Sequence, residues 1–265
     1  MFATAPPPEY PGYAQAPNDP NVRVHLTRGD KIDRLFQKYE ISHLFREKLE
    51  ILSDFKIVFI VDDSGSMNTP LEDSGPHSTR WDELKQVVET TIDIGSIYSS
   101  LDINFLNRSG MIQVSDFNQV SHLFTESPNG TTPLSNSLQN VLRMYQNYGS
   151  KILIVIATDG VPNDLDLFKR TLINKNHSKF YVSFLACSDN DKDVGYLNEL
   201  DKNVPNVDTL DDYISEKKEV LKAQGKSFSY TYADHVARLL LGPLCPELDS
   251  LDEGEGKLKS CCCIL

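Results

Sequence analysis

Two mainly apolar runs, each leading into an aspartate, constrain the fold of this chain most strongly. The first covers residues 55–61 and is followed directly by Asp62. The second covers residues 152–157 and leads through a threonine to Asp159. Runs that are rich in β-branched residues on both faces are typical of strands buried inside a parallel sheet. Because parallel strands need crossover connections, the runs predict an α/β fold with helices on both faces of the sheet.

The residues just past the first run carry oxygen donors at alternating positions. Asp62, Ser64 and Ser66 offer a carboxylate and two hydroxyls. Hard oxygen donors of this kind suit Mg²⁺, Mn²⁺ or Ca²⁺ rather than zinc. Alternatively, the two serines only cap a helix or a turn, which is a common use of serine. The capping interpretation does not account for the further oxygen donors at Thr132 and Asp159.

Three segments, 62–66, 130–134 and 152–160, occur in an order that resembles the von Willebrand factor A (vWA) family, the fold of integrin I domains. The metal-ion-dependent adhesion site of that family is built from D-x-S-x-S, a loop threonine and a strand-end aspartate. The resemblance covers roughly residues 55–241 and implies a Rossmann-like, doubly wound, mostly parallel sheet. It assigns the metal ligands to Asp62, Ser64, Ser66, Thr132 and Asp159.

Thr131 is an adjacent alternative to Thr132 for the loop ligand. Thr132 is preferred because the threonine of the family commonly precedes Pro-Leu at the start of a helix. A helix N-terminus near the ion adds partial positive charge, which favours an anion. In the family, the anion is typically a carboxylate of a partner protein, so the resemblance implies a metal-dependent protein-binding module. Asp63 departs from the family pattern, and either points away or adds negative charge that weakens the preference for an anion.

Charge and composition exclude several other classes. The formal net charge of −12 argues against a nucleic-acid partner. The apolar runs are strand-length, far short of the ~20 residues that a membrane span needs. The first residues lack a basic segment followed by an apolar core, so we expect no secretory signal. Cys187 lies in an apolar run, and three of the five cysteines gather at 261–263, which is no disulfide framework and favours a reducing, cytoplasmic compartment.

The sequence predicts four regions. They are a disordered Pro/Tyr-rich tail (1–28), a helical extension (29–54), the vWA domain (55–243) and a flexible acidic tail (244–265). Inside the domain, the patterns predict a helix after Thr79, a strand at 101–105, a short helix within 114–123, helices at 134–145 and 165–172, a strand at 180–187, and helices at 213–221 and 230–241.

The final residues fit the C-a-a-X prenylation pattern. The pattern places the prenyl group on Cys262, and the leucine at 265 indicates geranylgeranylation. One lipid chain anchors a protein only marginally, so a palmitoyl group on Cys261 is the expected second signal. The prediction is a chain held peripherally on the cytoplasmic face of a membrane. In location alone it resembles copines, although it lacks room for their C2 domains. Alternatively, the cysteines have a metal or redox role, or none.

A short motif near the start of the chain resembles the PPxY ligand of WW domains. Pro7, Pro8 and Tyr10 supply its defining positions. The alternative is a solvated low-complexity tail. An adaptor that recruits a WW-domain ubiquitin ligase through this motif is compatible with the binding function. Residues 73–78 resemble a phosphodegron, a pattern so short that it often arises by chance.

The competing functional class is an enzyme, a metal-dependent hydrolase or phosphatase that uses the same ion. Such an enzyme needs a general base within reach of the attacking water. None of the six histidines lies in the three metal segments, and only His77 lies in a loop that adjoins them. No Walker sequence, nucleophile elbow or paired Cys–His motif is present. The sequence therefore favours binding over catalysis.

Overall fold

The computed structural model describes residues 27–71, 78–188 and 190–253. Several predictions fall elsewhere. The predicted disordered tail lies outside the described residues except for its last two positions. The WW-ligand motif, the C-a-a-X segment with Cys261 and Cys262, and all but the last position of the phosphodegron-like segment also lie outside them.

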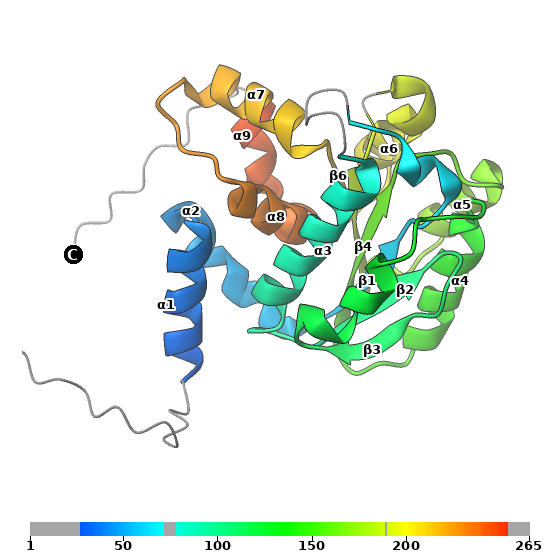
Figure 1. Ribbon diagram of the computed structural model, residues 1–265, viewed down its shortest axis with the longest axis horizontal. Helices are drawn as coiled ribbons and strands as arrows, with labels where there is room; N and C mark the ends of the chain where they lie inside the picture. Colours follow the sequence, from blue (N-terminus) through cyan, green and yellow to red (C-terminus); the bar gives the residue numbers. More distant parts are fainter. Residues whose placement is uncertain (1–26, 72–77, 189, 254–265) are drawn as a thin grey trace, which may run out of the picture.

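The core of the molecule is a six-stranded sheet in the order β3-β2-β1-β4-β5-β6 (Figure 1). Every neighbouring pair is parallel except β2 and β3, which are antiparallel. The strand order reverses between β1 and β4, which is the arrangement of a doubly wound α/β fold, so the predicted fold class is confirmed. The strands are β1 (Phe55–Val61), β2 (Leu101–Phe105), β3 (Met111–Val114), β4 (Lys151–Thr158), β5 (Phe180–Ala186) and β6 (Val207–Leu210).

Helices cover both faces of the sheet because alternate residues of the central strands point to opposite sides. In β1, Ile57 and Phe59 belong to one core cluster, whereas Val58 and Ile60 belong to the other. The first face is covered by α3 (Arg80–Gly95) and α8 (Tyr232–Leu241), and the second by α4 (Leu134–Tyr145), α5 (Leu165–Ile173) and α6 (Asp191–Asn203).

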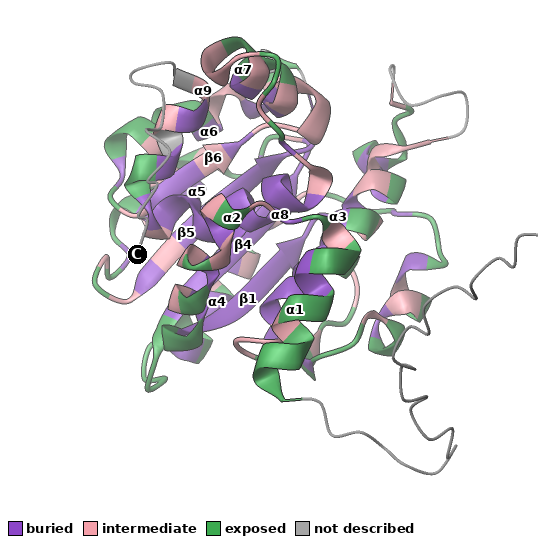
Figure 2. Cartoon of the chain, turned by 90° about the vertical axis from the view of Figure 1, so that its left-hand side faces the viewer, coloured by how far each residue is buried: buried purple, intermediate pink, exposed green. Residues whose placement is uncertain are grey.

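The helical extension predicted before the domain packs on the first face. It consists of α1 (Arg28–Tyr39), α2 (His43–Arg46) and a 3₁₀ segment (Lys48–Asp54). Figure 2 shows α1 and α2 over the sheet beside α3 and α8. The amide of Ser42 donates to Asp234 Oδ1 at 2.8 Å, which ties the extension to α8.

Among the strands and α-helices described within residues 55–243, β3, β6 and α6 have no counterpart in the sequence-based prediction. Both strands are four residues long, which is too short for a clear alternation. The short helix predicted within 114–123 is wrong. Val114, where the helix was predicted to start, is the last residue of β3, and two 3₁₀ turns follow at Phe117–Gln119 and Ser121–Phe124.

The flexible acidic tail predicted from residue 244 also needs correction. A 3₁₀ turn (Pro246–Asp249) and α9 (Ser250–Glu253) continue the fold, and α9 packs beside α7 (Tyr213–Gln224). The side chains of Leu248 and Leu251 are fully buried. Their burial offsets the entropy of ordering this stretch, so residues 246–253 belong to the packed part of the chain.

Within the described ranges, none of the helices combines the length and the apolar composition that a membrane crossing requires.

Candidate functional site

The predicted site lies at the carboxyl ends of β1 and β4, where the strand order reverses. In a doubly wound sheet this edge is the usual position of a binding crevice. Val61 and Ala157 are in register at the ends of the two strands, so the residues that follow them start side by side. Asp62 and Asp159 are both almost completely buried there.

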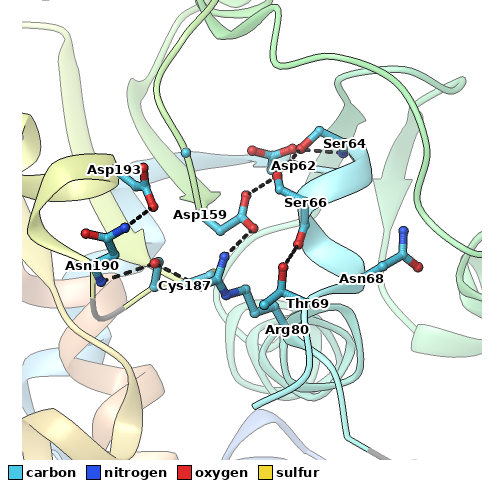
Figure 3. Close-up of polar contacts among 12 residues, drawn as sticks. Asp62, Ser64, Ser66, Asn68, Thr69, Arg80, Asp159, Cys187, Asn190 and Asp193 are labelled. Carbon is cyan, nitrogen blue, oxygen red and sulfur yellow. Dashed lines mark hydrogen bonds and ion pairs between the residues drawn. The ribbon is translucent and has the colours of Figure 1, made fainter. Parts of the chain in front are cut away.

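Four of the five predicted metal ligands form one hydrogen-bonded cluster (Figure 3). The amide of Ser64 donates to Asp62 Oδ1 at 2.9 Å. The hydroxyl oxygens of Ser64 and Ser66 lie 3.1 Å apart, and the Ser66 hydroxyl donates to Asp159 Oδ1 at 2.7 Å. Ser66 and Asp159, which are 93 residues apart in the sequence, therefore bring their side-chain oxygens into contact.

The loop that carries Thr132 packs against the serine loop. The amide of Gly65 donates to the carbonyl of Gly130 at 3.1 Å. Gly130 has a φ of +119°, and a Cβ there would lie 2.5 Å from the side chain of Asn107, so only glycine suits this approach. Among the described residues, no hydrogen bond joins the half-buried Thr132 hydroxyl to the other four predicted ligands.

Asn163, which the sequence-based prediction missed, positions the threonine loop. It follows β4, and its Oδ1 accepts the amide of Thr132 at 3.2 Å. Its Nδ2 donates to the Thr131 hydroxyl at 3.2 Å, so the hydroxyl of the alternative ligand has a protein partner. These contacts link the threonine loop to the segment that carries Asp159. The sequence holds no signal for this role because asparagine is common in loops.

Two further residues of the site were also missed. The hydroxyl of Thr158, the last residue of β4, donates to Asp62 Oδ2 at 2.6 Å. Arg80, the first residue of α3, donates from Nη1 to Asp159 Oδ2 at 2.8 Å (Figure 3). Its Nη2 donates to Ser188 Oγ at 3.0 Å. The position of Thr158 directly before Asp159 is a sequence signal that could have placed Thr158 near the site. The pairing of Arg80 with Asp159 depends on tertiary contact and has no such signal.

Asp63 points away from the cluster, which was one of the two possibilities left open by the sequence. Its Oδ1 accepts the amide of Asn107 at 2.8 Å, and its Oδ2 accepts Arg108 Nε at 2.7 Å. The Arg108 guanidinium offsets the charge of Asp63. Asp63 therefore anchors the loop after β2 and does not add an uncompensated charge to the site.

Burial dominates the electrostatics of Asp62. It raises the pKa of the Asp62 carboxyl to about 6, although hydrogen bonds from Ser64 and Thr158 oppose the shift. The charge of Asp159 contributes to the same upward shift of the pKa. The protein thus holds the carboxylates of Asp62 and Asp159 close together in a buried site. A bound cation would stabilise their charged forms.

The donor set fits a hard divalent cation. Adjacent ligands of an octahedral ion with bonds of about 2.1 Å lie about 3.0 Å apart, and the two serine hydroxyls are separated by 3.1 Å. In the ranges that the structure describes, no group of three or more His, Cys, Asp or Glu side chains could hold a metal ion. The chemistry of the cluster is therefore that of two carboxylates supplemented by hydroxyls, which suits Mg²⁺ or Mn²⁺.

The comparisons with known proteins found similar solved structures only. No protein-family model and no curated protein matches the chain. Manganese-loaded TRAP protein from Plasmodium vivax is similar at a TM-score of 0.44 and 15% identity, over 60% of this chain and 69% of that chain. The pilus adhesin SpaC from Lactobacillus rhamnosus GG, in its open conformation, gives a TM-score of 0.47 and 13% identity over 74% of this chain and 30% of that chain. Proximal thread matrix protein 1 from the mussel byssus is similar at a TM-score of 0.47 and 12% identity, over 72% of this chain and 48% of that chain.

Proposed function

We propose that this chain is a divalent-metal-dependent protein-binding module that takes a carboxylate of a partner protein at the metal. Asp62, Ser64, Ser66 and Asp159 would hold the ion, with Thr132 as the loop ligand. The observation that carries the proposal is the oxygen cluster at the carboxyl ends of β1 and β4. Mg²⁺ is the proposed ion, with Mn²⁺ or Ca²⁺ as alternatives.

The charge of the cluster supports an anionic ligand. The carboxylates of Asp62 and Asp159, together with the guanidinium of Arg80, leave one negative charge in excess. A divalent cation would turn this into one positive charge in excess, which attracts an anion in a site of low polarity. Ser66 is exposed, so the cluster reaches the surface where a partner can approach it.

Metal binding is the first test. Isothermal titration of the purified full chain with Mn²⁺ should show one site, and the Asp62→Ala and Ser66→Ala variants should bind at least tenfold more weakly. Asp116→Ala, which removes an exposed carboxylate outside the cluster, is the matched control and should bind as the unmodified chain does. Wild-type protein without a Mn²⁺ site would overturn the proposal.

Partner binding is the second test. Affinity capture from cell extract in Mg²⁺ should retain proteins that are lost when EDTA is added or when Asp62→Ala replaces the unmodified bait. A partner that stays bound under both conditions does not use the metal. The proposal also expects no turnover. Hydrolysis of generic phosphate or ester substrates that Asp62→Ala abolishes would establish an enzyme instead.

We further propose that a lipid on Cys262, with a palmitoyl group on Cys261 as second signal, tethers the module to the cytoplasmic face of a membrane. The support is the C-a-a-X pattern alone. Cys262→Ser should move the protein from the membrane fraction to the soluble fraction. Protein that stays in the membrane fraction after this change would exclude the prenyl anchor.

The proline motif near the start of the chain is proposed as a ligand for a WW-domain protein, such as a ubiquitin ligase. Its support is the residue pattern at Pro7, Pro8 and Tyr10. Tyr10→Ala should remove binding of an isolated WW domain. Binding that survives this change would rule out the motif as the contact.

A further inference from the structure

Arg80 brings a positive charge into the cluster that we propose as the metal site. Its guanidinium contacts the carboxylate of Asp159 through Nη1, at 2.8 Å. The hydroxyl of Ser66 contacts the other oxygen of the same carboxylate at 2.7 Å. Asp159 is therefore shared between the serine loop on one side and the first residue of α3 on the other (Figure 3).

The ion pair between Arg80 and Asp159 is largely buried and fixed by further contacts. The Arg80 side chain is 18% exposed and that of Asp159 is fully buried. Nη2 of Arg80 donates to Ser188, which is itself buried, so the guanidinium is fixed at two points. The backbone of Arg80 is fixed as well, because its amide donates to the carbonyl of Thr69 at 3.0 Å. A charge pair held this way is screened by solvent far less than an exposed one.

We propose that Arg80 sets the charge of the metal site: by pairing with Asp159 it weakens binding of the divalent cation and leaves the occupied site positive enough to take an anionic partner group. This inference rests on the proposed function above. The guanidinium neutralises one of the two carboxylates that would bind the ion. The same guanidinium makes the difference between a neutral and a positive site once the ion is present.

The inference has a signature that a purely structural role does not share. Removing the charge at Arg80 should strengthen metal binding and weaken anion binding at the same time. A residue that only supports the local fold would weaken both when it is replaced. The two affinities must therefore be measured separately on each variant.

Mn²⁺ serves as the metal probe and acetate as the anion probe. Mn²⁺ affinity is measured by electron paramagnetic resonance of the free ion. Acetate affinity for the Mn²⁺-loaded protein is measured by the fall in water-proton relaxation. Arg80→Gln should bind Mn²⁺ about tenfold more tightly and acetate about tenfold more weakly, because one unit charge close to the ion has been removed. Arg80→Lys retains the charge and should stay within about threefold of the unmodified chain in both measurements.

Arg108→Gln is the matched control. Arg108 has the same exposed fraction as Arg80, 18%, and pairs with the buried Asp63, which points away from the cluster. This variant leaves the Asp63 carboxylate without its partner, and it should raise Mn²⁺ affinity clearly less than Arg80→Gln does, because Asp63 points away from the cluster and is not a proposed ligand. An increase as large as that of Arg80→Gln would show that any lost positive charge has this effect, and would overturn the specific role of Arg80.

The outcomes separate the two proposals. Unmodified protein that does not bind Mn²⁺ overturns the proposed function and this inference together. Unmodified protein that binds Mn²⁺, with Arg80→Gln binding it equally or more weakly, overturns only the inference. Circular dichroism confirms folding of each variant first. Arg80→Met, which keeps the aliphatic stem without the charge, replaces Arg80→Gln if the glutamine variant does not fold.

Discussion

The hydroxyl of Thr158 donates a hydrogen bond of 2.6 Å to Asp62 Oδ2, across 96 residues of sequence. Both residues are fully buried, one at the end of β4 and the other just after β1. The bond joins the two strands at the point where the strand order reverses. It also holds the Asp62 carboxylate in one orientation while Ser64 binds the other oxygen.

Replacing Thr158 by valine should destabilise the protein by about 1–2 kcal/mol in the absence of metal. The substitution keeps the shape of the side chain but leaves one oxygen of the buried Asp62 carboxylate without its donor. Urea unfolding followed by circular dichroism measures the change. Thr158→Ser, which keeps the hydroxyl, is the control for the hydrogen bond. Equal stability of Thr158→Val and the unmodified chain would show that water or another group replaces the hydroxyl.

Saturating metal should stabilise the folded chain by mass action. At a free Mn²⁺ concentration of one hundred times the dissociation constant, the free energy of unfolding should rise by about 2.7 kcal/mol. Urea unfolding with and without Mn²⁺ measures the gain, and EDTA should reverse it. Asp62→Asn should lose the gain, whereas Asp116→Asn should keep it. Equal stabilisation of both variants would place the ion elsewhere.

Arg238 should be among the most costly polar residues to replace. Its guanidinium lies buried between Glu216 of α7 and Asp252 of α9, with Asp252 at 3.0 Å. Arg238→Met leaves two acids without their partner and should destabilise the protein by about 3–5 kcal/mol. Arg28→Met is the control, because Arg28 pairs with Glu50 at the surface and the loss should stay below about 1 kcal/mol. Similar losses for both variants in urea unfolding would contradict the prediction.

The corrected position of the acidic tail is tested by Leu251. The side chain is fully buried, so Leu251→Ala should leave a cavity and destabilise the protein by about 2–5 kcal/mol. Ile112→Ala is the control, because Ile112 is 69% exposed and should cost less than about 0.5 kcal/mol. A small effect at Leu251 in urea unfolding would restore the flexible tail from residue 244.

His235 should make the protein sensitive to mild acid. Burial, helped by the charge of Arg238 and opposed by Asp212, lowers the pKa of the His235 imidazole to about 3. The unfolded chain takes up this proton near pH 6.5, whereas the folded chain does not. The contribution of neutral His235 to the free energy of unfolding is therefore complete above pH 6.5. Below that pH it falls by about 1.4 kcal/mol per pH unit.

The test compares the unmodified chain with His235→Phe, which keeps an aromatic ring among the tyrosines that surround this position. Between pH 6.5 and pH 5.0, urea unfolding of the unmodified chain should lose about 2 kcal/mol more than that of the variant. Parallel pH profiles for the two proteins would assign the acid sensitivity to other groups.

The sequence was sufficient for the parts of the fold that depend on local pattern. The runs that became β1 and β4 are apolar on both faces, and only a strand between two layers of helices buries such a run. The resemblance to a known family proposed Asp62, Ser64, Ser66 and Asp159 together, and the position of the two aspartates at strand ends predicted that their loops share one edge of the sheet.

The sequence was insufficient where local pattern is weak or shared by different structures. The strand Val207–Leu210 is too short to show a period. The acidic segment at 246–253 has the composition of a solvated tail, yet two buried leucines and the ion pair of Asp252 with Arg238 order it. Local composition cannot reveal which distant surface will receive those leucines.

The amino-acid sequence by itself determined the layered α/β architecture, which follows from hydrophobic period, and its resemblance to a known family indicated which oxygen donors to examine. Only the tertiary structure decided what surrounds those donors. Arg80 and Asp159 are separated by 79 residues, and their contact exists because the start of α3 and the end of β4 meet at the same edge of the sheet. Charge pairing between distant segments depends on where the packed core places them, and that placement is a property of the whole fold.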